Sequence, residues 1–160
     1  MKKYDKVIFL DIDGVLNSFD HMVRTGEKGK SRFYAEIDPD ALAVLKTIID
    51  ATGAEIVLSS TWRYGYKRYK NTEESLPYIL NTALKEVGLE VVSTTPHLSG
   101  RPREEEIHEW LLNNLVNSYL ILDDDCDISQ TERLIRTSYD YGLTESHVEE
   151  CIKILNNPII

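Results

Sequence analysis

Short apolar runs alternate along this chain with longer stretches in which apolar residues recur every three or four positions. The short runs are typical of buried strands in a parallel sheet, and the longer stretches of amphipathic helices. Strands are predicted at residues 7–10, 55–59, 89–93, 119–122 and 134–137, and helices at residues 39–52, 73–86, 101–115 and 144–156. This alternation predicts a Rossmann-like, three-layer α/β/α fold with a mostly parallel, five-stranded sheet.

Two carboxylates, Asp11 and Asp13, directly follow the first predicted strand, and Gly14 comes next. In an open α/β sheet, ligands bind just outside the carboxyl ends of the strands. Two neighbouring carboxylates repel each other unless a cation or a shared proton relieves the repulsion. The pair therefore favours a metal site or acid–base chemistry, whereas a simple Asp-Gly turn is the alternative interpretation.

Two further strand ends carry polar side chains of the same kind. Ser59, Ser60 and Thr61 follow the second strand, and Asp123 and Asp124 end the fourth. A parallel sheet brings these ends to one rim. Carboxylates from two strands suit Mg²⁺, which is typically held by one or two carboxylates together with phosphate oxygens and water. The alternative for the acidic run is a solvated turn.

Cations are also expected at this rim, because hydroxyl and guanidinium groups bind phosphoryl oxygens. Arg101 and Arg103 lie where a helix begins, and Arg63 follows the second strand. Arg103 has an alternative role, since it could pair with Glu104 or Glu106 on its own helix. With these cations in place, one aspartate is free to attack phosphorus and a neighbouring one to move protons.

Four segments resemble, in order, the motifs of the haloacid dehalogenase (HAD) superfamily of phosphatases and phosphotransferases. They are residues 11–16 (DIDGVL), residues 57–60 (VLSS), Arg101 or Arg103, and residues 122–124 (LDD). The phrases LSSTWR at 58–63, ILDDD at 121–125 and YGLT at 141–144 are similar to the capless HAD phosphatase domains of RNA-repair proteins.

The resemblance implies a role for each of these residues. Asp11 would be the nucleophile that forms an aspartyl-phosphate, and Asp13 the general acid and base. Mg²⁺ would be held by the Asp11 carboxylate, the Asp13 backbone carbonyl and an acid after the fourth strand, with Asp124 the first choice and Asp123 supporting it. The second-motif hydroxyl is Ser60 or Ser59, and the third-motif cation is Arg103 or Arg101, in a position more often occupied by Lys.

Substrate contacts are expected from Gly14 and Thr61 in the motifs, from Arg63, and from Lys30 and Arg32 in a polar segment at 18–36. HAD proteins often carry a cap domain after the first or third strand, but residues 18–36 are only long enough for a small flap, with a hairpin expected near 32–35. The site should therefore be open. Three basic segments, 24–32, 63–70 and 101–103, are expected at its rim.

An open, basic rim suits a nucleic-acid 3′ or 5′ phosphate end, with Tyr64, Tyr66 and Tyr69 as candidates for stacking on bases. A phosphoprotein or a small phosphorylated metabolite is the alternative substrate. A phosphotransferase and an inactive phosphate-binding module are the alternative functions, although the chain keeps both Asp11 and Asp13. A receiver domain would need an isolated aspartate at the third strand and a lysine at the fifth, which are not evident.

The composition fits one domain over residues 1–160: 42% of the residues are hydrophobic and 28% are charged. A formal net charge of −9 argues against non-specific binding to nucleic acid, which depends on neutralising phosphates. No apolar run is long enough to span a bilayer, and the N-terminus runs directly into a strand without a signal peptide. Cys126 and Cys151 have no metal-ligand spacing and do not resemble a disulfide framework, so a reducing, cytoplasmic location is the expectation. No membrane association is expected, and the sequence does not indicate a stable protein partner.

Overall fold

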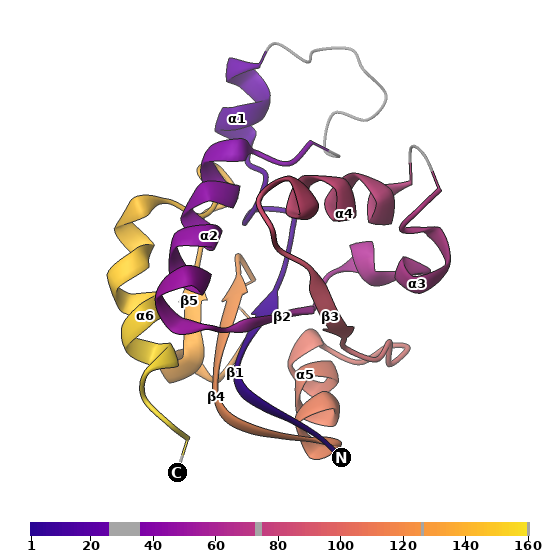
Figure 1. Cartoon of the computed structure of the whole chain (residues 1–160), viewed down its shortest axis with the longest axis vertical. Helices are drawn as coiled ribbons and strands as arrows, with labels where there is room; N and C mark the ends of the chain where they lie inside the picture. Colours follow the sequence, from indigo (N-terminus) through magenta and orange to yellow (C-terminus); the bar gives the residue numbers. More distant parts are fainter. Residues whose placement is uncertain (26–35, 73–74, 126, 160) are drawn as a thin grey trace.

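A five-stranded sheet forms the centre of the computed structural model, which describes residues 1–25, 36–72, 75–125 and 127–159 (Figure 1). The strands are β1 (Lys2–Leu10), β2 (Glu55–Leu58), β3 (Val91–Thr94), β4 (Asn114–Asp123) and β5 (Leu134–Arg136). Their order is β3-β2-β1-β4-β5, and every neighbouring pair is parallel. The predicted α/β fold is confirmed, with a sheet that is parallel throughout the described residues.

Helices cover both faces of the sheet and complete the three layers. They are α1 (Phe19–Arg24), α2 (Pro39–Thr52), α3 (Tyr66–Tyr69), α4 (Leu76–Glu86), α5 (Arg103–Leu112) and α6 (Val148–Leu155). Helix α2 starts as predicted, because the Asp38 side chain accepts a hydrogen bond from the Asp40 amide, and it ends at Gly53 in the left-handed conformation. Helices α2, α4 and α6 contribute to one hydrophobic cluster and α5 to the other.

These two clusters indicate on which face of the sheet the residues at the end of β1 lie. Successive side chains of a strand alternate between the two faces of the sheet. Phe9 lies in the cluster beneath α5, while Leu10 lies in the cluster beneath α2, α4 and α6. The alternation predicts that Asp11 continues on the α5 side, and its ion pair with the first residue of that helix confirms this.

Strands β1 and β4 are longer than their apolar runs predict. Their first halves pair with each other from Lys2 and Asn114 onwards, and many of the side chains there are exposed. The apolar pattern marks only the buried second halves. For the same reason the helix predicted at residues 101–115 extends too far, because α5 ends at Leu112 and Leu115 is an exposed residue of β4.

The segment predicted as a flap begins with the short helix α1, which the sequence pattern did not predict. Its first turn is capped by Ser18, whose side chain accepts a hydrogen bond from the His21 amide. The expected hairpin near 32–35, together with the proposed phosphate ligands Lys30 and Arg32, lies outside the described residues. None of the described helices combines the length and the apolar character that crossing a membrane would need.

Candidate active site

The candidate site lies where the carboxyl ends of β1 and β4 meet. The chain runs outward from β1 to β2 and β3, and then returns to the other side of β1 to form β4 and β5. Ligands of open α/β sheets bind at such a reversal of strand order. Leu10 pairs with Leu122 in the register of the sheet, so Asp11 and Asp123 are neighbours at the ends of two central strands.

Three carboxylates gather at this point. Asp11, Asp123 and Asp124 each offer an oxygen, and these oxygens lie within 4.8 Å of one another. Asp11 and Asp123 are buried, whereas Asp124 is partly exposed. One guanidinium faces the cluster, with Arg103 Nη1 at 3.1 Å from Asp11 Oδ2 and 2.6 Å from Asp123 Oδ2. Among the described residues, a single positive charge faces three carboxyl groups, which makes the site suited to a further cation.

The shifted pKa values show the electrostatic cost of this arrangement in the metal-free protein. The pKa of Asp11 is raised from its ordinary 3.8 to about 8. Burial is the largest cause; Arg103 lowers the pKa, and the charges of Asp123 and Asp124 contribute to the rise. Burial, followed by the charge of Asp123, also raises the pKa of Asp124. The pKa of Arg103 is raised, because Asp11 and Asp123 outweigh the opposing effect of its burial. The cluster therefore favours binding of protons or a metal cation.

The geometry distinguishes between the two candidate arginines. Arg103, the first residue of α5, contacts Asp11 and Asp123 as described above. Arg101 is largely exposed and pairs with Glu105 at 3.0 Å on the surface. Arg103 is thus the candidate arginine that contacts the acidic cluster, and it does not form the ion pairs with Glu104 or Glu106 that were its alternative role.

Asp13, the second aspartate of the first motif, accepts a hydrogen bond at each of its carboxylate oxygens. Asn17 Nδ2 donates a hydrogen bond of 2.8 Å to Asp13 Oδ1, and the indole Nε1 of the buried Trp62 donates one of 3.2 Å to Asp13 Oδ2. Both carboxylate oxygens therefore have a fixed partner. The sequence did not indicate this contact, because no local pattern connects two residues 49 positions apart.

Gly14 contributes space to the site. Its φ of +81° is left-handed, and a Cβ atom at this position would lie 2.3 Å from Asp124 Oδ2. Any side chain would therefore displace the Asp124 carboxylate from the cluster. The sequence predicted a substrate contact for Gly14, whereas the structure shows that it makes room for an acidic side chain.

The three hydroxyl groups after β2 have different surroundings. Ser60 Oγ accepts a hydrogen bond of 3.2 Å from the Trp62 amide and thereby caps a 3₁₀ turn, Thr61–Arg63. Ser59 Oγ is buried and has no hydrogen-bond partner among the described residues. Leu58 pairs with Leu10, so Ser59 stands next to Asp11 in the sheet. A buried hydroxyl without a partner is costly, which favours Ser59 over Ser60 as the hydroxyl available to a ligand.

A cavity of about 440 Å³ opens over these groups. Its lining includes Asp11, Asp13, Thr61, Arg103, Asp123, Asp124, Asp125 and Tyr139. Ser59, Ser60, Arg63 and Arg101 are not part of it. Tyr139 was not a sequence-predicted site residue. The cavity thus brings both motif aspartates, Thr61, the chosen arginine and the acids of β4 to one surface.

One protein family, described as the HAD domain in Swiss Army Knife RNA repair proteins, matches residues 7–148. The chain belongs to this family. Comparison with curated proteins and with solved structures gave no match. The HAD membership supports a hydrolase of the phosphatase type, and the matched range contains every described side chain of the cavity.

HAD enzymes generally use Mg²⁺, and the acidic cluster of this HAD domain fits that ion. All three side chains offer the oxygen ligands that Mg²⁺ prefers. Asp123 is already engaged at both oxygens, since Oδ2 contacts Arg103 and Oδ1 accepts a hydrogen bond from the Asp125 amide. Asp11 and Asp124 are therefore the carboxylates best placed to hold a metal, with Asp123 in support.

The predicted phosphate ligand Arg63 has a different position in this HAD domain. It is buried, with Nη2 at 2.7 Å from Glu106 Oε2 and Nη1 donating to the Ser60 carbonyl. This guanidinium connects the end of β2 to α5 and does not reach the cavity. Arg24 also has an acidic partner, Asp20 at 2.8 Å. The basic rim expected from the sequence is thus partly neutralised by internal ion pairs.

Proposed function

We propose that this HAD domain is a Mg²⁺-dependent phosphomonoester hydrolase that acts through an aspartyl-phosphate on Asp11, with nucleic-acid phosphate ends as its substrates. The observation that carries the proposal is the joint placement of two aspartates in one cavity. Asp11 lies at the end of β1 beside Arg103, and Asp13 lies two residues on with both oxygens held. This pair provides a nucleophile and a proton-transfer group.

The reaction then proceeds in two displacements at phosphorus. A carboxylate oxygen of Asp11 attacks, the bond to the leaving oxygen breaks, and Asp13 gives that oxygen a proton. Asp13 next takes a proton from a water molecule that attacks the aspartyl-phosphate, which releases phosphate and restores Asp11. Arg103 and the Thr61 hydroxyl, which both line the cavity, would bind phosphoryl oxygens. A bound Mg²⁺ would offset the combined negative charge of the phosphate and the carboxylates.

A nucleic-acid end is the proposed substrate for two reasons. The matching family is described as a domain of RNA repair proteins, and within the described residues no separate cap domain closes over the cavity. The net charge of −9 is unfavourable for binding long polyanions and suits recognition of an end. The family and the open site thus support the proposed substrate class, and the two aspartates support the proposed chemistry.

The test is phosphate release from a generic aryl phosphate ester, with and without Mg²⁺. Wild type should release phosphate only with the metal, and Asp11→Asn should abolish release. Asp50→Asn, which changes an exposed acid of α2 paired with Lys46, is the matched control and should behave as wild type. Failure of the wild type to release phosphate from the aryl ester or from 3′- or 5′-phosphorylated oligoribonucleotides would contradict the proposal.

A further inference from the structure

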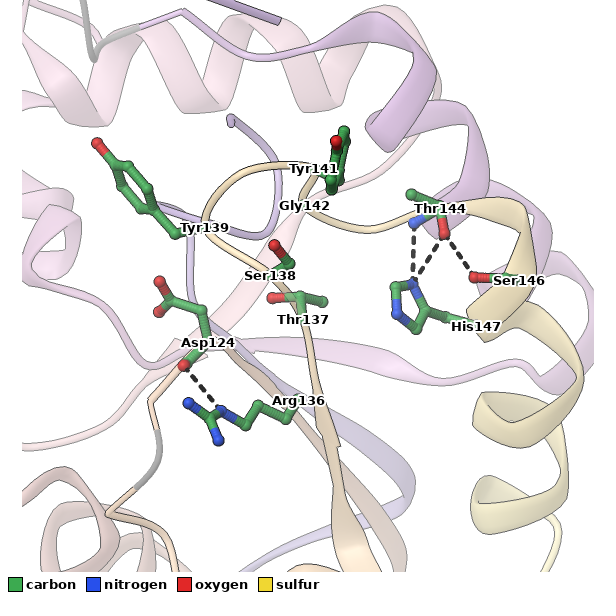
Figure 2. Close-up of a pocket in the computed structure, with 10 residues that line it drawn as sticks. All are labelled: Asp124, Arg136, Thr137, Ser138, Tyr139, Tyr141, Gly142, Thr144, Ser146 and His147. Atoms are coloured by element: carbon green, nitrogen blue, oxygen red, sulfur yellow. Dashed lines mark hydrogen bonds between the residues drawn. The ribbon is translucent and has the colours of Figure 1, made fainter. Parts of the chain in front are cut away.

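A second hollow adjoins the catalytic cavity. It has a volume of about 700 Å³ and is lined by Asp124 and by nine residues between positions 136 and 147 (Figure 2). We call it the β5–α6 groove. Asp124 and Tyr139 line both the groove and the catalytic cavity. A substrate with its phosphate at Asp11 could therefore extend directly into this groove, whose volume is within the roughly 300–1,000 Å³ of pockets that hold ligands of drug size.

The wall of the groove is hydrogen-bonded to the segment that follows β1, at Gly14 and Val15. Thr137 Oγ1 donates a 2.6 Å hydrogen bond to the Gly14 carbonyl, and the Leu143 amide donates one of 2.8 Å to the Val15 carbonyl. Between them, Gly142 packs so closely that a Cβ atom would lie 2.8 Å from the Val15 oxygen. The groove is thus held in register with Asp11 and Asp13, and a ligand need not order it on binding.

Two tyrosines give the groove exposed aromatic surface. Tyr139 is 44% exposed and Tyr141 is 65% exposed, and Figure 2 shows both rings projecting from the loop after β5. Tyr139 lies at the junction with the catalytic cavity, while Tyr141 lies further along the groove. Exposed aromatic faces next to a phosphate site are the means by which single-stranded nucleic acids are bound without reading their sequence.

One cation completes the surface. Arg136 Nε donates a 3.3 Å hydrogen bond to the Asp124 carbonyl, which anchors the side chain beside the catalytic cluster (Figure 2). Across the described residues its two terminal nitrogens form no hydrogen bond or ion pair. An anchored guanidinium with both terminal nitrogens available suits bidentate contact with a phosphate. Arg63, Arg101 and Arg24 are all paired with carboxylates and offer no equivalent.

We propose that the β5–α6 groove binds the terminal nucleotides of a nucleic-acid end, with a base stacked on Tyr139 or Tyr141 and the adjoining phosphodiester on Arg136. This inference rests on the proposed function, since it takes the terminal phosphate to be at Asp11. Two aromatic faces and a single guanidinium suit a ligand that carries a base and a phosphodiester. A peptide backbone carries neither group and suits this surface less well. Only one or two nucleotides are engaged, which is compatible with an acidic protein.

The test compares the hydrolysis of two substrates. One is a tetraribonucleotide that carries a 3′ or 5′ phosphate, and the other is an aryl phosphate that is too small to fill the groove. Tyr141→Ala should lower the ratio of kcat/KM for the tetranucleotide to that for the aryl phosphate by about tenfold or more, as expected for loss of one stacked base. Tyr78→Ala is the matched control, because Tyr78 is a partly exposed residue of α4 that lines neither cavity. Its ratio should stay within twofold of wild type.

Binding provides a second readout that does not need turnover. In an Asp11→Asn background with Mg²⁺, Arg136→Gln should weaken binding of the phosphorylated tetranucleotide and reduce the slope of log K against log salt by about 0.7, the value for one phosphate contact on a single strand. Equal effects of Tyr78→Ala and Tyr141→Ala on both readouts would overturn the inference. So would tighter binding of a phosphoserine peptide that depends on Tyr141.

The two proposals fail in different ways. If wild type hydrolyses the aryl phosphate but the groove variants leave the tetranucleotide ratio unchanged, the phosphatase stands and the groove assignment is wrong. If wild type hydrolyses neither substrate but binds the phosphorylated tetranucleotide, and Tyr141→Ala weakens this binding while Tyr78→Ala does not, the phosphatase fails and the groove assignment stands.

Discussion

Replacing Asp11 by Asn should stabilise the metal-free protein while abolishing its activity. Burial raises the pKa of Asp11 from 3.8 to about 8, so between these pH values the folded protein holds a proton that the unfolded chain has released. The associated stability is therefore fully present below pH 3.8 and is lost as the pH rises towards 8. Each pH unit in this interval contributes about 1.4 kcal/mol, which amounts to about 4 kcal/mol at pH 7. Asn cannot ionise and avoids this loss.

The assay is urea unfolding of both proteins in the presence of EDTA, at pH values from 4 to 8. The advantage of Asp11→Asn in the free energy of unfolding should be near zero at pH 4 and should grow with pH to about 4 kcal/mol at pH 7. Mg²⁺ should reduce the difference, because it stabilises the ionised Asp11 of wild type. An advantage that is independent of pH, or a less stable variant at pH 7, would refute this electrostatic reasoning.

Three further substitutions test individual contacts. Trp62→Phe removes the indole donor to Asp13 Oδ2 and should lower kcat about tenfold for alkyl phosphates, whose leaving oxygen needs a proton, but less for an aryl phosphate; equal losses in steady-state assays would argue against a positioning role. Arg103→Ala leaves two buried carboxylates without their cation and should lower the free energy of unfolding by roughly 3–5 kcal/mol in EDTA, with a loss under 1 kcal/mol contradicting the pairing. Glu106→Gln weakens the buried Arg63 ion pair and should lower the free energy of unfolding in urea by a few kcal/mol. At temperatures where the variant is folded, its kcat for the aryl phosphate should stay within about twofold of wild type. A large drop in kcat would indicate that Arg63 takes part in catalysis.

Much of the site follows from the sequence, because its residues stand at the ends of apolar runs. The runs before Asp11, Ser59 and Asp123 read as buried strands, and parallel pairing then requires their ends to meet. The register of the sheet confirms that these three residues are neighbours. Local pattern is sufficient here because strand ends and their polar residues are adjacent in the chain.

The sequence could not separate residues that differ only in tertiary contacts. Arg63 and Arg103 each follow a polar turn near a strand end, yet packing of α5 buries one against Glu106 and places the other at Asp11. Ser59 and Ser60 are adjacent and chemically identical, and only the cap on the Trp62 amide distinguishes them. These differences arise from tertiary packing, and the spacing of residues in the sequence does not predict them.

The groove was missed because its signal is weak in the sequence. The sequence favours Tyr64, Tyr66 and Tyr69 for base stacking, because basic residues are their close neighbours. The structure buries Tyr66 and places Tyr139 and Tyr141 beside the catalytic cavity. Two tyrosines on either side of a turn after the last strand were the available clue, since that strand also ends at the rim where ligands bind.

The most direct test of the central claim is to detect the phosphoryl group on Asp11. Asp13→Asn should react with an aryl phosphate and Mg²⁺ to release one equivalent of the phenol and then stall, because the group that activates water is absent. Acid quenching, digestion and peptide mass spectrometry should then find one phosphoryl group on Asp11, and none in an Asp11→Asn variant treated alike. Steady turnover by Asp11→Asn, or a phosphoryl group on another residue, would contradict the account.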